Sequence, residues 1–403
     1  MSNPSCVRWL QIGNQSARGT AASTLYHVDF QDEFYPVTDV SRIERNDLRY
    51  DGEFGNALIG PKSGSVSPTL FLRGGGTAAG DGTAMVNNFE MSQVLNSLFG
   101  AVGNLGTGVI SGTSHDTDTI KLAATANWPV GQGILIDSDS TAGSRYEARE
   151  VKSVSTDTSV DLDRALQGAP ANAAVAYAST SYKIDPDTVD RAALHLTVDV
   201  EGDGFRRQLI DCLPKCKLVV PSAGPCRLET ELVCGDWTDL ADANPTYAAN
   251  YDNLGTPLMG NGSIFWLGAT KTDLLECTID FGLTPTPHTS VNGTNGMNGF
   301  HMIYEGATFT GKIYDDSDST LAEMVSGTGI TTYDIAIQIG GTGTSACSNC
   351  VYIRIPVLDI VRANRENVGG VDVISFTGKA RRVASGTGVS SLTMHVFGFD
   401  TEA

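Results

Sequence analysis

ALHLTVDVEGDGFRRQLIDCLPKCKLVVPSAGPCRLETELVCGDW, residues 193–237, is the segment that indicates the fold class most clearly. Apolar and polar residues alternate along residues 194–201, and the alternation resumes over 206–212 and 227–234. Because side chains of a strand point alternately to its two faces, this pattern predicts three antiparallel strands with one buried and one solvated face. The predicted solvated face carries acids, and no catalytic motif lies near it. The stretch therefore favours a structural surface over an active site.

The rest of the chain has the composition of a globular, mainly β protein. Of its 403 residues 41% are hydrophobic and 18% are charged, which argues against disorder. Its 45 glycines separate short runs of Val, Ala, Ser and Thr, a mixture typical of short strands joined by turns. Further strands are predicted over residues 20–40, 68–73, 275–281, 308–314, 333–339, 351–358, 371–376 and 392–399.

One helix is predicted. Residues 91–99 carry apolar side chains at the i, i+3, i+4, i+7, i+8 spacing of an amphipathic helix. Asn87 with Glu90 resembles a capping pair, and Gly100 is a suitable stop. We expect this helix to cover one face of an antiparallel sheet.

Residues 107–181 differ in their sequence pattern from the segments that flank them. Short strand patterns recur there at regular spacing between Ser, Thr, Asp and Gly turns, which favours a small β-barrel. Strand-rich sequence lies on both sides of this segment. We therefore predict a discontinuous β-sandwich domain made of residues 1–106 and 182–403, with a small β-barrel module inserted at 107–181.

The charge and the absence of apolar segments restrict the possible partners. The formal net charge is −19 at pH 7. A protein that grips nucleic acid needs a basic patch to displace counterions from the phosphates, so stable DNA binding is not expected. The first residues show no secretion signal, and no apolar run reaches the ~20 residues that span a bilayer. These features predict a soluble protein made in a cytoplasm, without a membrane partner.

The chain has eight cysteines. In a large protein without a visible signal, most are expected to be buried thiols, among them Cys212, Cys226, Cys234 and Cys277. Cys347 and Cys350 have the closest spacing, and a local disulfide between them is predicted once the protein leaves the reducing cytoplasm. A zinc site would need Cys212 and Cys216 as a second pair, and no histidines cluster nearby. No metal or cofactor is expected.

Several motifs with chemical associations are better explained as structure. Residues 306–313 have the spacing of a phosphate loop, but Ile313 replaces the required hydroxyl and the segment reads as a strand. Glycines 74–76 lack a βαβ context, and the acidic runs at 137–139 and 315–318 lack the glycine and distal glutamate of a calcium loop. Ser114, His115 and Asp116 are adjacent, so on a strand they would point to opposite faces. No active site is predicted.

In the pattern of its elements, the chain resembles the tail tube (major tail) proteins of tailed bacteriophages. The matching features are early strands within residues 25–37, a long charged loop, the helix ending at Phe99, the strands from Leu194, and residues 228–237, which close with a glycine and an aromatic. Residues 128–176 are similar to small β-modules that recur as insertions in phage virion proteins. The resemblance covers most of the chain and is weakest after Trp237.

The resemblance implies an antiparallel β-sandwich or barrel with a flanking helix, six copies of which form a ring. Inner strands of such a ring join into one barrel, and rings stack into a hollow tube that carries the genome, which leaves no sheet edges open. It implies a virion protein assembled in the host bacterial cytoplasm. Its partners would be further copies of itself and the tape measure, tail terminator and distal tail or baseplate proteins, while DNA passes through without specific binding.

The resemblance also suggests roles for two sets of residues. Candidates for the lumen wall, where like charge keeps DNA from adhering, are Asp199, Glu201, Glu229 and Glu231. Alternatively, these acids solubilise an outer face. Candidates for contacts between subunits or rings, or else for a solvated loop, are Arg42, Arg45, Asp47, Arg49 and Asp51. The inserted module is expected on the exterior, because a bulky insertion would block the lumen.

Other functions remain as alternatives. A head decoration or tail fibre protein is the nearest, although fibres usually show repeats or coiled coils, which the sequence lacks. A carbohydrate-binding surface protein would need export and exposed aromatics, whereas aromatic residues make up 7%. A β-sandwich hydrolase would need converging carboxylates. We expect a structural protein and not an enzyme.

Overall fold

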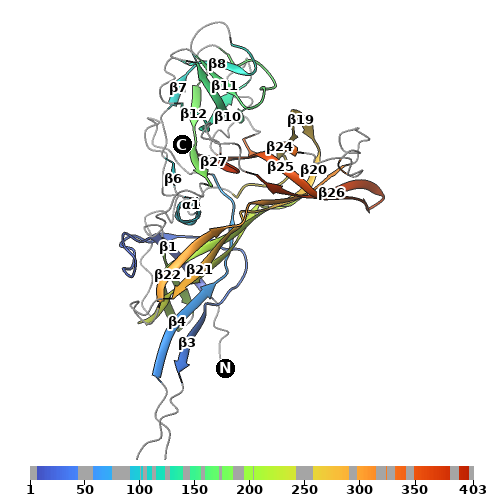
Figure 1. Cartoon of the computed structure of the whole chain (residues 1–403). Helices are drawn as coiled ribbons and strands as arrows, with labels where there is room; N and C mark the ends of the chain where they lie inside the picture. The colour runs from blue at the N-terminus through green and yellow to red at the C-terminus, as the bar shows by residue number, and fades with distance from the viewer. Residues whose placement is uncertain are drawn as a thin grey trace, which may run out of the picture.

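The computed structural model describes residues 7–43, 58–74, 91–99, 101–102, 107–110, 115–122, 128–138, 146–155, 159–171, 175–184, 195–202, 204–241, 257–289, 297–314, 324, 332–341, 349–381 and 390–398. Within these residues the chain is mainly β, with large antiparallel sheets and one helix, α1 (Ser92–Phe99) (Figure 1). The predicted mainly β, sandwich-type fold is therefore confirmed. In the described part of the chain the large sheet stays open and closes no barrel.

Nineteen strands belong to one continuous sheet, which divides into layers because two long strands change partners along their length. The first layer has the order β3–β4–β16–β15–β20–β23–β26–β25. Its strands are β3 (Val37–Ile43), β4 (Leu58–Val66), β16 (Arg227–Cys234), β15 (Phe205–Val220), β20 (Leu274–Asp280), β23 (Thr308–Tyr314), β26 (Val371–Ala380) and β25 (Asn349–Val368), and β5 (Thr69–Phe71) also pairs with β16.

The second layer has the order β6–β13–β27–β25–β24–β18–β19. It comprises β6 (Ala101–Val102), β13 (Thr180–Lys183), β27 (Thr393–Gly398), the first half of β25, β24 (Thr332–Gly340), β18 (Ile264–Leu267) and β19 (Thr270–Thr272). β25 serves both layers, since residues 349–359 pair with β27 or β24 and residues 358–368 pair with β26. The two layers face each other as a sandwich.

A side branch leaves the first layer through β15. The first half of β15 pairs with β14 (Leu196–Gly202) and β17 (Asp236–Leu240), and β14 continues to β1 (Val7–Asn14) and β2 (Tyr26–His27). The change of partner falls at Asp211, whose φ is +55°, and at Pro214. Pro214 lacks an N–H, and on one edge of β15 it lies in the gap between the β14 pairing, which ends at Cys212, and the β20 pairing, which starts at Lys217. On the other edge it is paired with Leu232 of β16.

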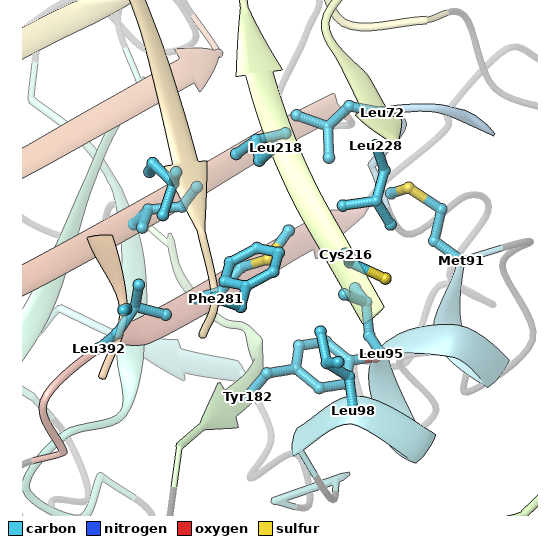
Figure 2. Close-up of a cluster of buried hydrophobic side chains, with 14 of the residues drawn as sticks. Leu72, Met91, Leu95, Leu98, Tyr182, Cys216, Leu218, Leu228, Phe281 and Leu392 are labelled. Carbon is cyan, nitrogen blue, oxygen red and sulfur yellow. The ribbon is translucent and has the colours of Figure 1, made fainter. Parts of the chain in front are cut away.

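The main core lies between the two layers and around α1. Phe265 of the second layer stacks on Phe309 of the first with ring centroids 5.9 Å apart. Figure 2 shows Leu95 and Leu98 of α1 against Tyr182, with further apolar side chains of β15 and β16 around them. The helix is confirmed over the predicted residues, but all eight of its residues are buried. It is thus a core element and not the half-exposed cover that an amphipathic pattern predicts.

Two smaller sheets complete the fold. β21 (Leu283–Thr289) and β22 (Met297–Tyr304) form a hairpin that contacts β15. The second sheet has the order β7 (Thr107–Val109), β12 (Val175–Ala178), β9 (Gly133–Asp137), β10 (Tyr146–Ser155), β11 (Ser159–Leu162) and β8 (Thr119–Lys121), all within the segment read from the sequence as an insertion. An isolated bridge between Ile110 and Leu122 links its two outer strands, and Trp128 and Ile136 belong to its own core.

The six-stranded sheet, which we call the module, packs on the second layer. Leu135 and Ala148 of the module share a buried cluster with Trp266, Ala336 and Tyr352 of the second layer. The order through the molecule is therefore first layer, second layer, module. Figure 1 shows the module at the top, the β26 turn at the right and the β3–β4 hairpin at the bottom.

Strand boundaries differ from the sequence-based prediction in several places, among them residues 58–66, which form β4 where part of a long loop was expected. The strand expected over residues 20–40 is reduced to β2 and the start of β3, the strand expected to end at Cys212 continues to Val220, and the strand expected over 351–358 continues to Val368. The segment with phosphate-loop spacing forms strand β23, as predicted.

Candidate functional site

Two of the predicted lumen residues are buried. Asp199 and Glu201 are 3% and 9% exposed, and all seven residues of β14 are buried. The Asp199 carboxylate accepts hydrogen bonds from the Arg206 guanidinium at 2.7 and 3.1 Å. The prediction that this face of β14 is solvated is wrong: β1 and β15 pair with its two edges, and the side chains on both of its faces are buried.

Glu229 and Glu231 are exposed on β16, but they do not form an acidic surface. Lys217 and Lys215 of β15 stand directly opposite them. The Lys215 ammonium lies 3.8 Å from the Glu231 carboxylate. Directly opposed side chains on one face interact, so this surface carries both signs of charge.

One face of the first layer carries exposed or half-exposed polar side chains across six strands, and we call it the charged face. One row of directly paired residues across it reads Glu229, Lys217, Asp280, Thr308, Lys379 and Asp359. The Lys217 ammonium lies 3.8 Å from Asp280, and in the adjoining part of the face Lys312 lies 2.9 Å from Glu276. Charges therefore alternate across the sheet, and the described residues of this face form no concentrated basic patch for a polyanion.

Beyond its contact with β24, β25 forms a projecting ribbon with β26, which we call the arm (residues 360–372). Its turn, Gly369 and Gly370, has φ values of 63° and 91°, the conformation of a two-residue hairpin turn in which both residues need positive φ. The Asn367 side chain accepts a hydrogen bond from the Gly370 N–H at 3.0 Å and holds the turn. Val361, at a register shift of β25, is 72% exposed, and Val368 and Val371 are also exposed.

The first layer ends in two strand edges that no described strand covers. β3 pairs with β4 alone among the described strands, and β25 beyond Asp359 pairs there with β26 alone. Exposed apolar side chains lie at both edges: Val361 on β25, and at the other edge Val37, the first residue of β3, with Tyr35 just before the strand. Val37 is 67% exposed. An open edge offers unpaired N–H and C=O groups to another chain, so these are the places where a partner strand can add.

The charged loop predicted to contact other subunits follows β3. Arg42 lies on β3 itself, and its backbone is paired with Ile59 of β4. The other candidates, Arg45, Asp47, Arg49 and Asp51, lie outside the described residues. Of the acidic runs, residues 315–318 also lie outside them, and so does Ser114.

A buried polar cluster joins the module to the second layer, centred on Glu150 of β10. Its carboxylate accepts hydrogen bonds from Arg354 at 2.8 Å and Thr393 at 2.5 Å, and lies 3.1 Å from His395 Nε2. Burial alone would raise the pKa of Glu150, but the His395 hydrogen bond, the Arg354 charge and the Thr393 hydroxyl together lower it to about 2. Glu150 is therefore an ionised group held by strands β25 and β27.

The cluster continues along the same interface through a second set of ions. Asp334 of β24 accepts hydrogen bonds from Arg354 at 2.8 Å and from Arg164 of the module at 2.5 Å. Asp163 of the module accepts from Arg164 and from the Tyr352 hydroxyl, both at 2.5 Å. Buried charges are costly unless they are paired, and here each is paired across the contact between module and second layer. The module is thus joined to the sandwich by specific contacts that would be disrupted if it separated.

Three residues of this cluster have the side-chain types of a hydrolytic triad. Ser181 Oγ lies 2.9 Å from His395 Nδ1, and His395 Nε2 lies 3.1 Å from Glu150. All three residues are 0% exposed. A nucleophilic serine has to reach its substrate, and the Glu150 carboxylate is already bonded to Arg354 and Thr393, so the geometry favours a structural role.

The cysteines differ from the prediction. Cys212 of β15 and Cys234 of β16 form a disulfide, so the expectation of free thiols is wrong for this pair, and Cys212 is not available to the zinc site considered above. Cys226 and Cys277 are buried thiols, as predicted. Cys277 lies on β20, and Cys226 directly precedes β16. Cys212 and Cys234 meet because β15 pairs with β16.

The disulfide predicted between Cys347 and Cys350 involves a residue, Cys347, that lies outside the described residues. Cys350 itself is a buried thiol. Cys350 belongs to the apolar contact between the second layer and the module.

The four free cysteines of the described residues are expected to resist alkylation in the folded protein. Burial raises the pKa of Cys216 and Cys226 to about 12 and the pKa of Cys277 and Cys350 further, so little thiolate forms at pH 8. Iodoacetamide followed by peptide mass spectrometry should find them unmodified before unfolding and modified afterwards. Equal labelling in both states would contradict their burial.

Two exposed histidines lie side by side on the β21–β22 hairpin, a pair that the sequence does not reveal. The rings of His288 and His301 have centroids 4.6 Å apart at an interplanar angle of 46°. Of the other four histidines, His27, His195 and His395 are buried and His115 is half-buried. Only the hairpin register brings the exposed two together.

Comparisons with known proteins assign the chain to no family. The chain matches no protein-family model and no curated protein. In the described part of the chain, no helix has the length and apolar character needed to cross a membrane, and no group of three or more His, Cys, Asp or Glu side chains is placed to hold a metal ion. The exposed features of the described residues that could contact a partner are the charged face, the arm and the two open edges.

Proposed function

We propose that the chain is a structural virion protein that forms rings of six, and that the rings stack into the tail tube of a bacteriophage. The observation that carries the proposal is the first layer, an eight-stranded sheet with an exposed charged face and two uncovered edges. A sheet of this kind is suited to join the next copy edge to edge. The pattern of strands and helix that resembles the tail tube family supports the same reading.

In the proposed ring, the β25 edge of one copy pairs with the β3 edge of the next. The two edges are the opposite ends of one sheet, so the contact is head-to-tail and repeats until the ring closes. Unpaired backbone groups of both edges gain hydrogen bonds, and Val361 of one copy is placed near Tyr35 and Val37 of the next. Covering each of these exposed apolar side chains contributes on the order of 1–2 kcal/mol.

The charged face then lines the lumen and the module lies outside. The module packs on the second layer, on the far side of the sandwich from the charged face. Alternating charges keep local attraction for phosphates low, while a net charge of −19 per chain repels DNA as a whole. Glu229 and Glu231 remain lumen candidates in this arrangement, whereas the buried Asp199 and Glu201 do not.

The tube so formed is a negatively charged conduit for genome delivery. Its remaining partners would be the tape measure protein inside it and the tail terminator and distal tail or baseplate proteins at its ends. DNA passes through without specific binding, because the charged face has no concentrated basic patch among the described residues.

Replacing Val37 by lysine is expected to block assembly. A lysine on an edge strand disfavours pairing with a further strand, while the exposed position leaves the monomer intact. In sedimentation velocity, the wild type should shift from monomer to rings as its concentration rises, and Val37→Lys should stay monomeric at concentrations at least about tenfold higher.

Val154→Lys is the matched control, because Val154 is an exposed valine on strand β10 of the module. This variant should assemble like the wild type. Assembly of Val37→Lys at the wild-type concentration would exclude β3 from the contact.

A further inference from the structure

We infer that His288 and His301 form a two-imidazole chelate for a divalent transition-metal ion of the Zn²⁺, Cu²⁺ and Ni²⁺ class. The inference is independent of the tail-tube proposal and rests on the β21–β22 hairpin alone. Both residues are exposed, so neither ring fills the core, and their centroids are 4.6 Å apart. Imidazole nitrogen is a ligand that suits Zn²⁺, Cu²⁺ and Ni²⁺.

The spacing of the two rings fits one shared ion. A metal-bound imidazole has its nitrogen about 2.0–2.1 Å from the metal. Two such rings at an N–metal–N angle of about 90–110° have centroids roughly 4.5–5 Å apart. The observed 4.6 Å lies in that range, so the separation of the two rings is compatible with one ion bound by a nitrogen of each.

The hairpin holds the pair in place before metal binds. Thr286 of β21 stands directly opposite His301, and the register shifts between Pro287 and Thr289, so His288 lies in an irregular position of the ladder. Such irregularities re-aim a side chain, and here the two rings meet although their residues are not directly paired. Pro285 and Pro287 fix φ on either side of Thr286 and stiffen the strand that carries His288.

The charges near the pair do not oppose a cation strongly. The Arg18 guanidinium lies against Gly299, in the strand of His301, but Asp211 lies 3.5 Å from it and offsets its charge. Two protein ligands leave the remaining coordination positions to water. We therefore expect an exchangeable surface site and not a structural metal centre, which would need four protein ligands.

The test is isothermal titration calorimetry of the tag-free full chain with Zn²⁺ at pH 7.5, at a concentration where the protein is monomeric. We expect one saturable site per chain. His288→Ala and His301→Ala should each weaken Zn²⁺ binding by at least about tenfold, because a chelate loses one of its two ligands. Circular dichroism should report the wild-type fold for both, since the replaced rings are exposed.

His115→Ala is the control, because His115 lies in the module, away from the hairpin, and should bind Zn²⁺ as the wild type does. The absence of saturable binding to the wild type, or unchanged affinity in either hairpin variant, would overturn the inference. Neither result depends on whether the chain forms tubes.

Discussion

Replacing Glu150 by alanine is expected to lower the free energy of unfolding by about 3–5 kcal/mol. The variant would remove one of the three carboxylates around the buried guanidinium of Arg354, which keeps Asp334 at 2.8 Å and Asp163 at 3.6 Å, and it would remove the acceptor for Thr393 and His395. The buried Arg354 charge would be less well compensated, and each buried polar group left without its hydrogen-bond partner adds a cost of about 1–3 kcal/mol. Urea denaturation of the full chain at pH 7 measures the effect.

The loss of unfolding free energy in Glu150→Ala should depend on pH. The folded-state pKa of Glu150 is about 2, below its ordinary value of 4.5, because hydrogen bonds and the Arg354 charge outweigh its burial. A group with a depressed pKa stabilises the folded state above its unfolded pKa and loses that contribution as the pH falls through the folded one. The difference between the wild type and Glu150→Ala should therefore be full above about pH 4.5 and shrink toward pH 2.

Glu229→Ala is the matched control, an acid on an exposed strand whose loss should change stability by less than about 0.5 kcal/mol. If Glu150→Ala cost no more than this control, the polar cluster would not be what holds the module to the second layer.

The second large effect is expected when two assembly-deficient variants are mixed. Val361→Lys blocks the β25 edge and Val37→Lys blocks the β3 edge, so each alone should remain a monomer. Each still has one intact edge, and the two intact edges are complementary. An equimolar mixture should therefore form a dimer and nothing larger, because both outer edges of that dimer carry a lysine.

Sedimentation velocity of each variant and of the mixture measures this outcome. A mixture that stays monomeric would show that β25 and β3 do not pair with each other. Dimers of either variant alone would point to a symmetric contact, in which the same edge meets itself, and would exclude the head-to-tail ring.

Much of the strand pattern could be predicted because it depends on local alternation. Residues 308–314 alternate between core and face, and β23 has those bounds. The helix also follows from its apolar spacing. The alternation of polar and apolar residues does not tell whether other parts of the chain cover the polar face of a strand. His195 to Glu201 alternate like a half-exposed strand, yet a covered position inside the side branch buries Asp199 and Glu201.

The surfaces that carry the proposals could not be predicted for a related reason. Beyond Leu358 the sequence of β25 turns polar and loses the apolar alternation that marks a buried strand, although the strand continues for ten residues as the arm. The lysines opposite Glu229 and Glu231, the partners of Glu150 and the His288–His301 pair all come from other strands. Such contacts depend on register between distant segments, which a single sequence does not display.

Negative-stain electron microscopy of the purified wild-type chain at rising concentration shows directly whether it forms a tube. We expect hollow rings or tubes with sixfold end views and with the module as density on the outside, and we expect Val361→Lys to abolish them. A chain that remains a monomer, or forms a compact oligomer without a central channel, at concentrations where Val361→Lys behaves identically would contradict the tail-tube proposal.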